Sequence, residues 1–201
     1  MPWYPDIAGF AYCETLQVRN LILDKQQPLI PARQHLLEPG SAEFIAALAA
    51  GSKCRHIVHI GCGLSTIALA TAARATGSCI YCVNSDRSKQ EIVRQYCEDL
   101  GLTEFVNFSQ EEPRRFIAHT DVVDFALFTD EPEFYIELFN LLKLKEGAIV
   151  VAYNALDEST NDYIRHVRQQ PGVDSSTLPL GRGIEVTKII SWDQFTSRRL
   201  S

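Results

Sequence analysis

Strand-like and helix-like segments alternate five times between residues 55 and 168, and this alternation constrains the fold more than any other feature. Short apolar runs of the kind found in buried strands are each followed by a helical pattern. Such repeats predict parallel strands joined by right-handed crossovers, with helices on both faces of the sheet. The predicted pairs are Arg55–Ile60 with Ser65–Thr76, Cys79–Asn84 with Lys89–Leu100, Glu104–Phe108 with Glu111–Ala118, Val122–Phe128 with Glu133–Leu142, and Ala148–Tyr153 with Glu158–Arg168.

The end of the chain departs from this pattern. Asp174–Leu178 and Ile184–Ile190 are two strand-like runs joined by a glycine-containing turn, which predicts a β-hairpin. We therefore expect an α/β fold with a mostly parallel seven-stranded sheet and an antiparallel C-terminal hairpin. Residues 1–201 are predicted to form a single domain, with 1–38 as an N-terminal arm that includes the amphipathic segment AGFAYCETLQ, and 39–201 as the core. Ser41 is predicted to cap a helix that ends at Gly51.

Charge and hydropathy exclude several classes of partner. The net charge of −6 argues against nucleic acid as the main partner, because binding phosphates requires a basic surface. No apolar run approaches the length of a membrane span, and the N-terminal MPWYPDIAGF lacks the pattern of a secretory signal. We expect a cytoplasmic protein with a small-molecule ligand and with neither a nucleic-acid nor a membrane partner, and homodimer formation is left open.

The six cysteines do not indicate a disulfide framework, because they are spread through predicted strands and helices of a chain that is long enough to build a core. Cys79 and Cys82 form a CxxC pair, but the surrounding SCIYCVN has the pattern of a strand. Residues three apart on a strand point to opposite faces, and no second CxxC or spaced histidine pair completes a zinc site. We expect no metal there.

The first predicted strand is followed by Gly61-Cys62-Gly63 and an alanine-rich helix. Strand, glycine turn and helix together form the phosphate- or nucleoside-binding corner of a doubly wound sheet. Glycines let the backbone approach a ligand closely, and the helix N-terminus presents unpaired N–H groups. Ser65 is predicted to cap this helix through its hydroxyl. The same pattern also occurs as an ordinary tight turn, so by itself it leaves the ligand open.

The chain carries EFIAALAA before the first strand, HIGCGLSTIALA at the glycine turn, RQYCEDLGL after the second strand and LPLGRGIEVTKI in the hairpin. These segments resemble the S-adenosylmethionine-dependent O-methyltransferases of the catechol and caffeoyl-coenzyme A type. Through WYPDIAGFAYCETLQ, LATAARATG, VNSDRS and LPLGRGIEV the chain more closely resembles a plant family of uncharacterised methyltransferase-like proteins, known as a domain of unknown function. The resemblance implies a Rossmann-like class I methyltransferase fold and S-adenosylmethionine as the cofactor.

The resemblance also implies positions for the cofactor. Gly61, Gly63 and Ser65 would hold its methionine end, and an acidic residue about 20 residues beyond the glycines would bind the ribose hydroxyls. That position is Asn84, whose amide can donate and accept hydrogen bonds but lacks the charge that strengthens them. Asp86 could substitute for it, and Asn84 could also simply cap the turn. On this interpretation, Asn84→Asp is expected to tighten binding.

Two further positions follow from the same resemblance. Glu111, after the third strand, lies where an acidic residue often reaches the adenine edge, although an acidic residue there also suits a helix N-terminus. His59 lies in the first strand, where the resembled enzymes usually carry an acidic residue.

The resemblance is weakest at the catalytic positions. In the resembled enzymes, an aspartate that ends the fourth strand and an Asp-Asn pair that ends the fifth strand hold a divalent metal, and of these three residues only the asparagine is present here. Here those positions are Thr129, Tyr153 and Asn154, a set poor in the hard oxygen ligands that Mg²⁺ requires, and Pro132 replaces the usual catalytic lysine. We therefore expect no metal, with Asp130 or Tyr153 as a base or an orienting group.

Three functions fit these observations. The first is a metal-independent S-adenosylmethionine-dependent methyltransferase, in which positioning the reactants dominates catalysis. The second is a non-catalytic relative that binds a nucleoside ligand or a protein partner, which the altered ligand positions favour. The third is an NAD(P)-binding oxidoreductase, against which the closing hairpin and the missing third loop glycine count. The acceptor of a methyl group cannot be named from the sequence.

Overall fold

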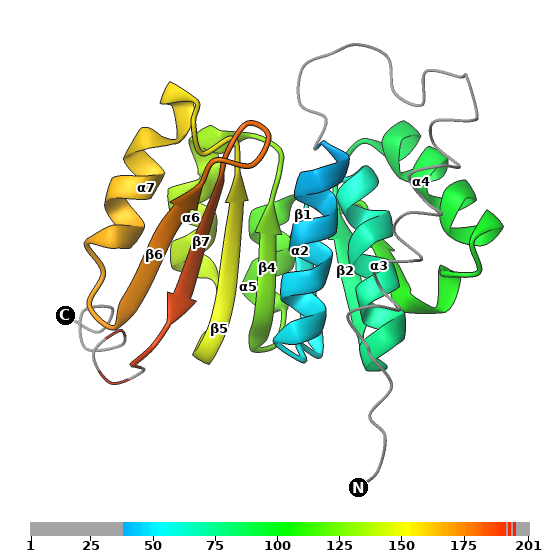
Figure 1. Ribbon diagram of the computed structural model, residues 1–201. Coiled ribbons are helices and arrows are strands. Elements are labelled where there is room, and N and C mark those ends of the chain that lie inside the picture. Colours follow the sequence, from blue (N-terminus) through cyan, green and yellow to red (C-terminus); the bar gives the residue numbers. More distant parts are fainter. Residues whose placement is uncertain (1–37, 192, 194, 196–201) are drawn as a thin grey trace, which may run out of the picture.

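The computed structural model describes residues 38–191, 193 and 195, which build a sheet of seven strands in the order β3-β2-β1-β4-β5-β7-β6 (Figure 1). The strands are β1 His56–Ile60, β2 Cys79–Val83, β3 Val106–Ser109, β4 Val123–Phe128, β5 Leu144–Tyr153, β6 Val173–Leu178 and β7 Ile184–Ile189. β1 to β5 pair in parallel, whereas β7 lies antiparallel between β5 and β6. The predicted α/β fold with its antiparallel C-terminal hairpin is confirmed.

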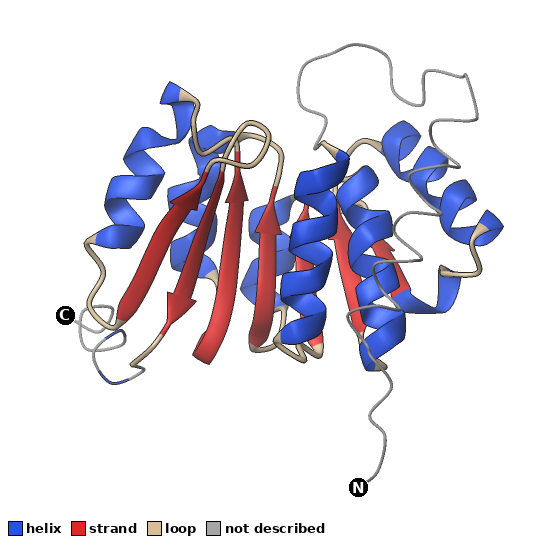
Figure 2. Cartoon of the chain, in the orientation of Figure 1, coloured by secondary structure: helices blue, strands red, loops and turns tan. Residues whose placement is uncertain are grey.

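Helices cover both faces of the sheet, which forms one continuous layer between them (Figure 2). The α-helices are α2 Pro39–Gly51, α3 Leu64–Thr76, α4 Arg87–Asp99, α5 Pro113–His119, α6 Tyr135–Leu141 and α7 Asn161–Arg168, and the short 3-10 helices are η1 Thr103–Phe105, η2 Pro132–Phe134 and η3 Glu158–Thr160. One apolar cluster joins α2, α3 and α4 to the sheet, and a second joins α5, α6 and α7 to its other face. None of the described helices combines the length and the apolar character needed to cross a membrane.

Alternation along the strands determines which residues face which helices. Ile57 packs in the cluster with α2 and α3, whereas its neighbour Val58 packs in the cluster with α5 and α6. Central strands buried on both faces read as continuous apolar runs, as β4 does in VDFALF, where all six residues are buried. The sheet is therefore the rigid support on which the loops at its carboxyl edge are held.

The structure differs from the predicted elements at several places. α2 begins at Pro39, a position that favours proline, so Ser41 lies inside the helix rather than capping it. β3 begins at Val106 instead of Glu104, because Thr103–Phe105 forms a 3-10 turn. β5 begins at Leu144, four residues earlier than predicted, and Leu144 pairs with Val123 across a register shift. The predicted amphipathic segment of the N-terminal arm lies outside the described residues.

A further difference is at the glycine turn. α3 begins at Leu64 with Gly63 as its N-cap, and the Gly63 N–H donates to the Thr66 hydroxyl over 3.2 Å. Ser65 therefore lies in the first helical turn, and its buried hydroxyl contacts His59 instead of capping the helix.

Candidate functional site

A cleft of about 590 Å³ opens at the carboxyl ends of the parallel strands. From β1 the chain passes through α3 to β2, which lies beside one edge of β1. It later returns to β4, which lies beside the other edge of β1, so the strand order reverses between β1 and β4. In open α/β sheets, ligands bind in the crevice outside such a switch point. The cleft is lined by Ile60, Gly61, Val83, Asn84, Ser85, Asp86, Lys89, Pro113, Asp130, Glu131, Pro132, Glu133, Asn154, Asp157, Ser159 and Arg182.

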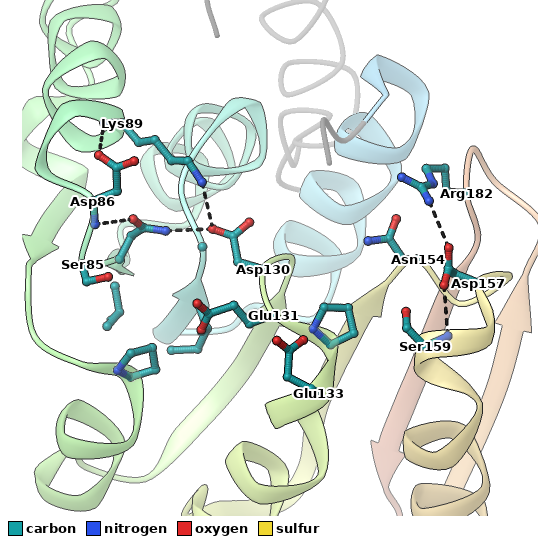
Figure 3. Close-up of a pocket in the computed structure, with 16 residues that line it drawn as sticks. Ser85, Asp86, Lys89, Asp130, Glu131, Glu133, Asn154, Asp157, Ser159 and Arg182 are labelled. Atoms are coloured by element: carbon teal, nitrogen blue, oxygen red, sulfur yellow. Dashed lines mark hydrogen bonds and ion pairs between the residues drawn. The ribbon is translucent and has the colours of Figure 1, made fainter. Parts of the chain in front are cut away.

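Asp130, which follows β4, is held by two residues from the neighbouring β2–α4 segment (Figure 3). The Asn84 side-chain amide donates to the Asp130 carboxylate over 2.8 Å, and the Lys89 ammonium lies 3.6 Å from the same oxygen. The Asp130 side chain is 23 % exposed, so the carboxylate keeps access to the cleft. β4 ends at Phe128, so Asp130 lies beyond the strand, and its carboxylate faces Asn84 at the end of β2.

Both the oxygen and the nitrogen of the Asn84 side-chain amide form hydrogen bonds within the protein. Its oxygen accepts the Asp86 N–H over 2.8 Å while its nitrogen donates to Asp130. The Asp86 carboxylate in turn caps α4 by accepting the N–H groups of Ser88 and Lys89. An aspartate at position 84 would set two carboxylates against each other. This contact reverses the expected effect of Asn84→Asp from tighter to weaker binding.

His59 lies beneath the glycine turn and is fully buried. Its Nδ1 is 3.0 Å from the Thr66 hydroxyl, and its Nε2 is 3.0 Å from the Thr129 hydroxyl and 3.1 Å from that of Ser65. Burial lowers the pKa of His59 to about 3, so the imidazole is neutral near pH 7. This network ties β1, α3 and the end of β4 together below the floor of the cleft.

Position 61 requires a glycine because side chains of the protein itself lie close to its backbone. Gly61 has a φ of +134°, and a Cβ there would lie 2.0 Å from the Thr129 hydroxyl oxygen and 3.1 Å from Nε2 of His59. The space beside this glycine is therefore filled by the polar network and not by a ligand. Gly61 lines the cleft through its backbone.

Gly61→Ala is expected to lower the free energy of unfolding of the ligand-free protein by about 1–2 kcal/mol, because Thr129 must rotate away and the backbone is strained. Urea unfolding followed by circular dichroism measures the effect. Adding Thr129→Ala should recover part of the loss, since it removes the hydroxyl that clashes. Unchanged stability of Gly61→Ala would mean that the glycine is needed only for a ligand.

Of the predicted site residues, Gly61, Asn84 and Asp130 line the cleft, and four do not. Gly63 and Ser65 belong to the start of α3 and to the network around His59. Glu111 pairs with His119 of α5, with the carboxylate oxygen 3.7 Å from Nε2.

Tyr153 is the fourth, and the structure does not bring its fully buried side chain into the cleft. Its hydroxyl donates to the Glu38 carboxylate at the N-cap of α2. Burial, and then the neighbouring Glu38, raise the pKa of Tyr153 well above the ordinary value, so the phenol remains protonated at physiological pH.

The three positions aligned with metal ligands do not converge in this chain. The Thr129 hydroxyl contacts His59 and the Ile60 carbonyl, and the Tyr153 hydroxyl contacts Glu38, which leaves Asn154 alone facing the cleft. Within the described ranges, no group of three or more His, Cys, Asp or Glu side chains could hold a metal ion. This donor set does not fit the metal that the resemblance implies.

Five charged residues of the cleft were not among the predicted ligands or catalytic groups: Lys89, Glu131, Glu133, Asp157 and Arg182. The position of most of them in the sequence, just after a predicted strand, could have indicated the site, because residues just beyond the carboxyl ends of parallel strands meet at one edge of the sheet. Glu131 and Glu133 follow β4, and Asp157 follows β5. Arg182 comes from the β6–β7 turn, and its approach to Asp157 over 3.1 Å depends on the antiparallel pairing of β5 with β7.

Several solved structures with the same architecture are described as methyltransferases. A methyltransferase from Geobacter sulfurreducens is 19 % identical, with a TM-score of 0.68 over 95 % of this chain and 92 % of its own. The O-methyltransferase TomG from Streptomyces achromogenes, involved in tomaymycin synthesis and crystallised with S-adenosylmethionine, is 15 % identical, with a TM-score of 0.68 over 94 % and 92 % of the two chains. An O-methyltransferase from Bacillus cereus in complex with S-adenosylhomocysteine is 14 % identical, with a TM-score of 0.67 over 94 % and 93 %.

Identities at this level establish a shared fold. A search of curated proteins finds no match. A family model described as a protein of unknown function, DUF1442, matches residues 2–199, which is nearly the whole sequence. The chain therefore belongs to the DUF1442 family of proteins of unknown function, built on the fold of the Rossmann-like methyltransferases.

Proposed function

We propose that this protein is an S-adenosylmethionine-dependent methyltransferase that acts on a small molecule without a metal. The observation that carries the proposal is the polar cleft at the β1–β4 switch point, lined by Gly61, Asn84 and Asp130. Structural neighbours bind S-adenosylmethionine or S-adenosylhomocysteine on this same fold, which supports the assignment. The lack of converging ligands at Thr129, Tyr153 and Asn154 supports independence from metal.

The donor set of the cleft fits an adenosyl ligand in part. A ribose presents two hydroxyl donors, and the partly exposed Asp130 carboxylate can accept from them in the role usually taken by an acid at the end of the second strand. Asn84 orients this carboxylate, and Lys89 balances its charge. When bound, the cofactor supplies a sulfonium-activated methyl group, and the chain's own contribution is to align the two reactants and keep water away.

Asp130→Asn is expected to weaken S-adenosylhomocysteine binding about tenfold, since a hydrogen bond to a charged group contributes about 1.5–3 kcal/mol. Asn84→Asp is expected to weaken it as well, because it repels Asp130. Isothermal titration calorimetry of the full chain measures both. Asp121→Asn, an equal loss of charge at an exposed position outside the cleft, is the matched control and should bind as the wild type does.

The same titrations separate the competing functions. Wild-type protein that binds neither S-adenosylmethionine nor S-adenosylhomocysteine at millimolar concentration contradicts the methyltransferase proposal and favours a non-catalytic relative. Binding of NAD instead would favour an oxidoreductase. Equal affinities of Asp130→Asn and wild type would remove Asp130 from the cofactor site.

A further inference from the structure

Two carboxylates in the middle of the cleft have no counter-charge within the described part of the chain. Lys89 pairs with Asp130 on one side of the cleft, and Arg182 pairs with Asp157 on the other. Glu131 and Glu133 lie between these pairs, in the segment that joins β4 to α6; both residues are exposed, and their carboxylates form no hydrogen bond or ion pair with another described residue (Figure 3). The lining as a whole holds five carboxylates and two basic groups. An anionic ligand would be repelled here.

An independent observation at the same place points to a hydrogen-bond donor. Asn154, at the end of β5, is 2 % exposed and lines the cleft, yet its side-chain oxygen has no partner among the described residues. A buried amide oxygen without a donor costs free energy comparable to a lost hydrogen bond. Its backbone has a φ of +65°, in the left-handed region that asparagine adopts more readily than most residues do. A donor carried by a ligand would complete the hydrogen bonding of this oxygen.

We propose that the methyl acceptor is a small aliphatic amine, bound as an ammonium between Glu131, Glu133 and the Asn154 oxygen. An ammonium supplies the positive charge that the two carboxylates lack and the N–H donor that the amide oxygen lacks. This inference rests on the proposed function and adds the class of the acceptor to it. A thioester of coenzyme A, with its phosphates, and a dianionic acid are excluded as acceptors by the same charges.

The arrangement also provides for the proton that the reaction releases. Before methyl transfer, one N–H proton passes to Glu131 or Glu133, which frees the nitrogen lone pair. The lone pair then forms a bond to the methyl carbon as the carbon–sulfur bond breaks and its electron pair stays on sulfur. The products are an N-methylated ammonium ion, a neutral thioether and a protonated carboxyl group, which returns its proton to water.

Titration of the full chain with 1,4-diaminobutane, in the presence of saturating S-adenosylhomocysteine, tests the proposal by calorimetry. The diamine is expected to bind, whereas its neutral analogue 1,4-butanediol and the dianion succinate are not. Glu131→Gln/Glu133→Gln should weaken diamine binding by at least about tenfold. The matched control Glu104→Gln/Asp174→Asn removes two charges at exposed positions outside the cleft and should leave the affinity within about twofold of wild type.

Asn154→Gly tests the second observation separately. Glycine accepts the positive φ, so this substitution removes the amide oxygen without straining the backbone. It should weaken diamine binding about fivefold while leaving S-adenosylhomocysteine binding unchanged.

Three results would overturn the inference: no diamine binding at millimolar concentration, equal affinity in the Glu131→Gln/Glu133→Gln variant, or direct competition between the diamine and S-adenosylhomocysteine. Competition would place the cation in the cofactor's own site. Failure of the proposed function looks different. In that case S-adenosylhomocysteine does not bind, while the diamine binds in its absence and still depends on Glu131 and Glu133.

Discussion

Arg168→Ala is expected to destabilise the protein by about 3 kcal/mol, because it leaves a carboxylate buried without its counter-charge. Glu185 of β7 is fully buried, and both of its oxygens accept hydrogen bonds from Arg168 of α7, over 2.9 Å and 3.0 Å. Ser175 and Thr177 of β6 complete its shell. This loss of stability is at the lower end of the range expected when a buried ion pair is broken, because the Arg168 side chain is 45 % exposed and water can reach the Glu185 carboxylate once the arginine is removed.

Urea unfolding followed by circular dichroism gives this difference, and Arg165→Ala is the matched control. Arg165 lies on the same helix, is 71 % exposed and, among the described residues, pairs only with Asp162 three residues away, so its loss should cost less than about 1 kcal/mol. Adding Glu185→Gln to Arg168→Ala should recover part of the stability by removing the uncompensated charge. If Arg168→Ala costs no more than Arg165→Ala, the pair does not hold the hairpin to α7.

Acidification from pH 7 to pH 4 is expected to remove about 3 kcal/mol of stability through His59 alone. Burial lowers its pKa in the folded protein to about 3, against 6.5 in an unfolded chain. Below pH 6.5 the unfolded state therefore binds a proton that the folded state does not. Stability is complete above pH 6.5 and falls by about 1.4 kcal/mol per unit until the pH approaches 3.

His59→Gln removes this titration while it keeps hydrogen-bonding atoms near Thr66 and Thr129. Other groups that titrate cancel when the variant is compared with wild type, so the stability difference between the two should shrink by about 3 kcal/mol between pH 7 and pH 4. Denaturant unfolding at several pH values measures it. Parallel pH profiles for wild type and His59→Gln would contradict the assignment.

The chain belongs to the DUF1442 family and has the fold of the methyltransferases, and the two stability predictions concern different parts of that fold. Glu185 and Arg168 stabilise the hairpin end of the sheet, whereas His59 stabilises the floor of the cleft. The candidate ligand-binding residues lie on the loops above. Stability and binding can therefore be tested with separate substitutions.

The fold could be predicted because it depends on patterns that are local in the sequence. Buried strands such as β4 are continuous apolar runs, and glycines such as Gly77 end the helices, so five strand–helix units and a hairpin can be recognised without knowing any long-range contact. The right-handedness of the crossovers and the shortness of the connections then leave few possible strand orders. The position of the site at the carboxyl edge of the sheet follows from the same reasoning.

The partners of individual side chains were decided by the tertiary structure. Asn84 meets Asp130, and Gly61 meets Thr129, across strands that are distant in sequence but neighbours in the sheet. Their chemistry depends on a register and on a loop direction that no local pattern encodes. For this reason the sequence determined where a ligand can bind, whereas the packing of β1 against β2 and β4 decided which carboxylates face it.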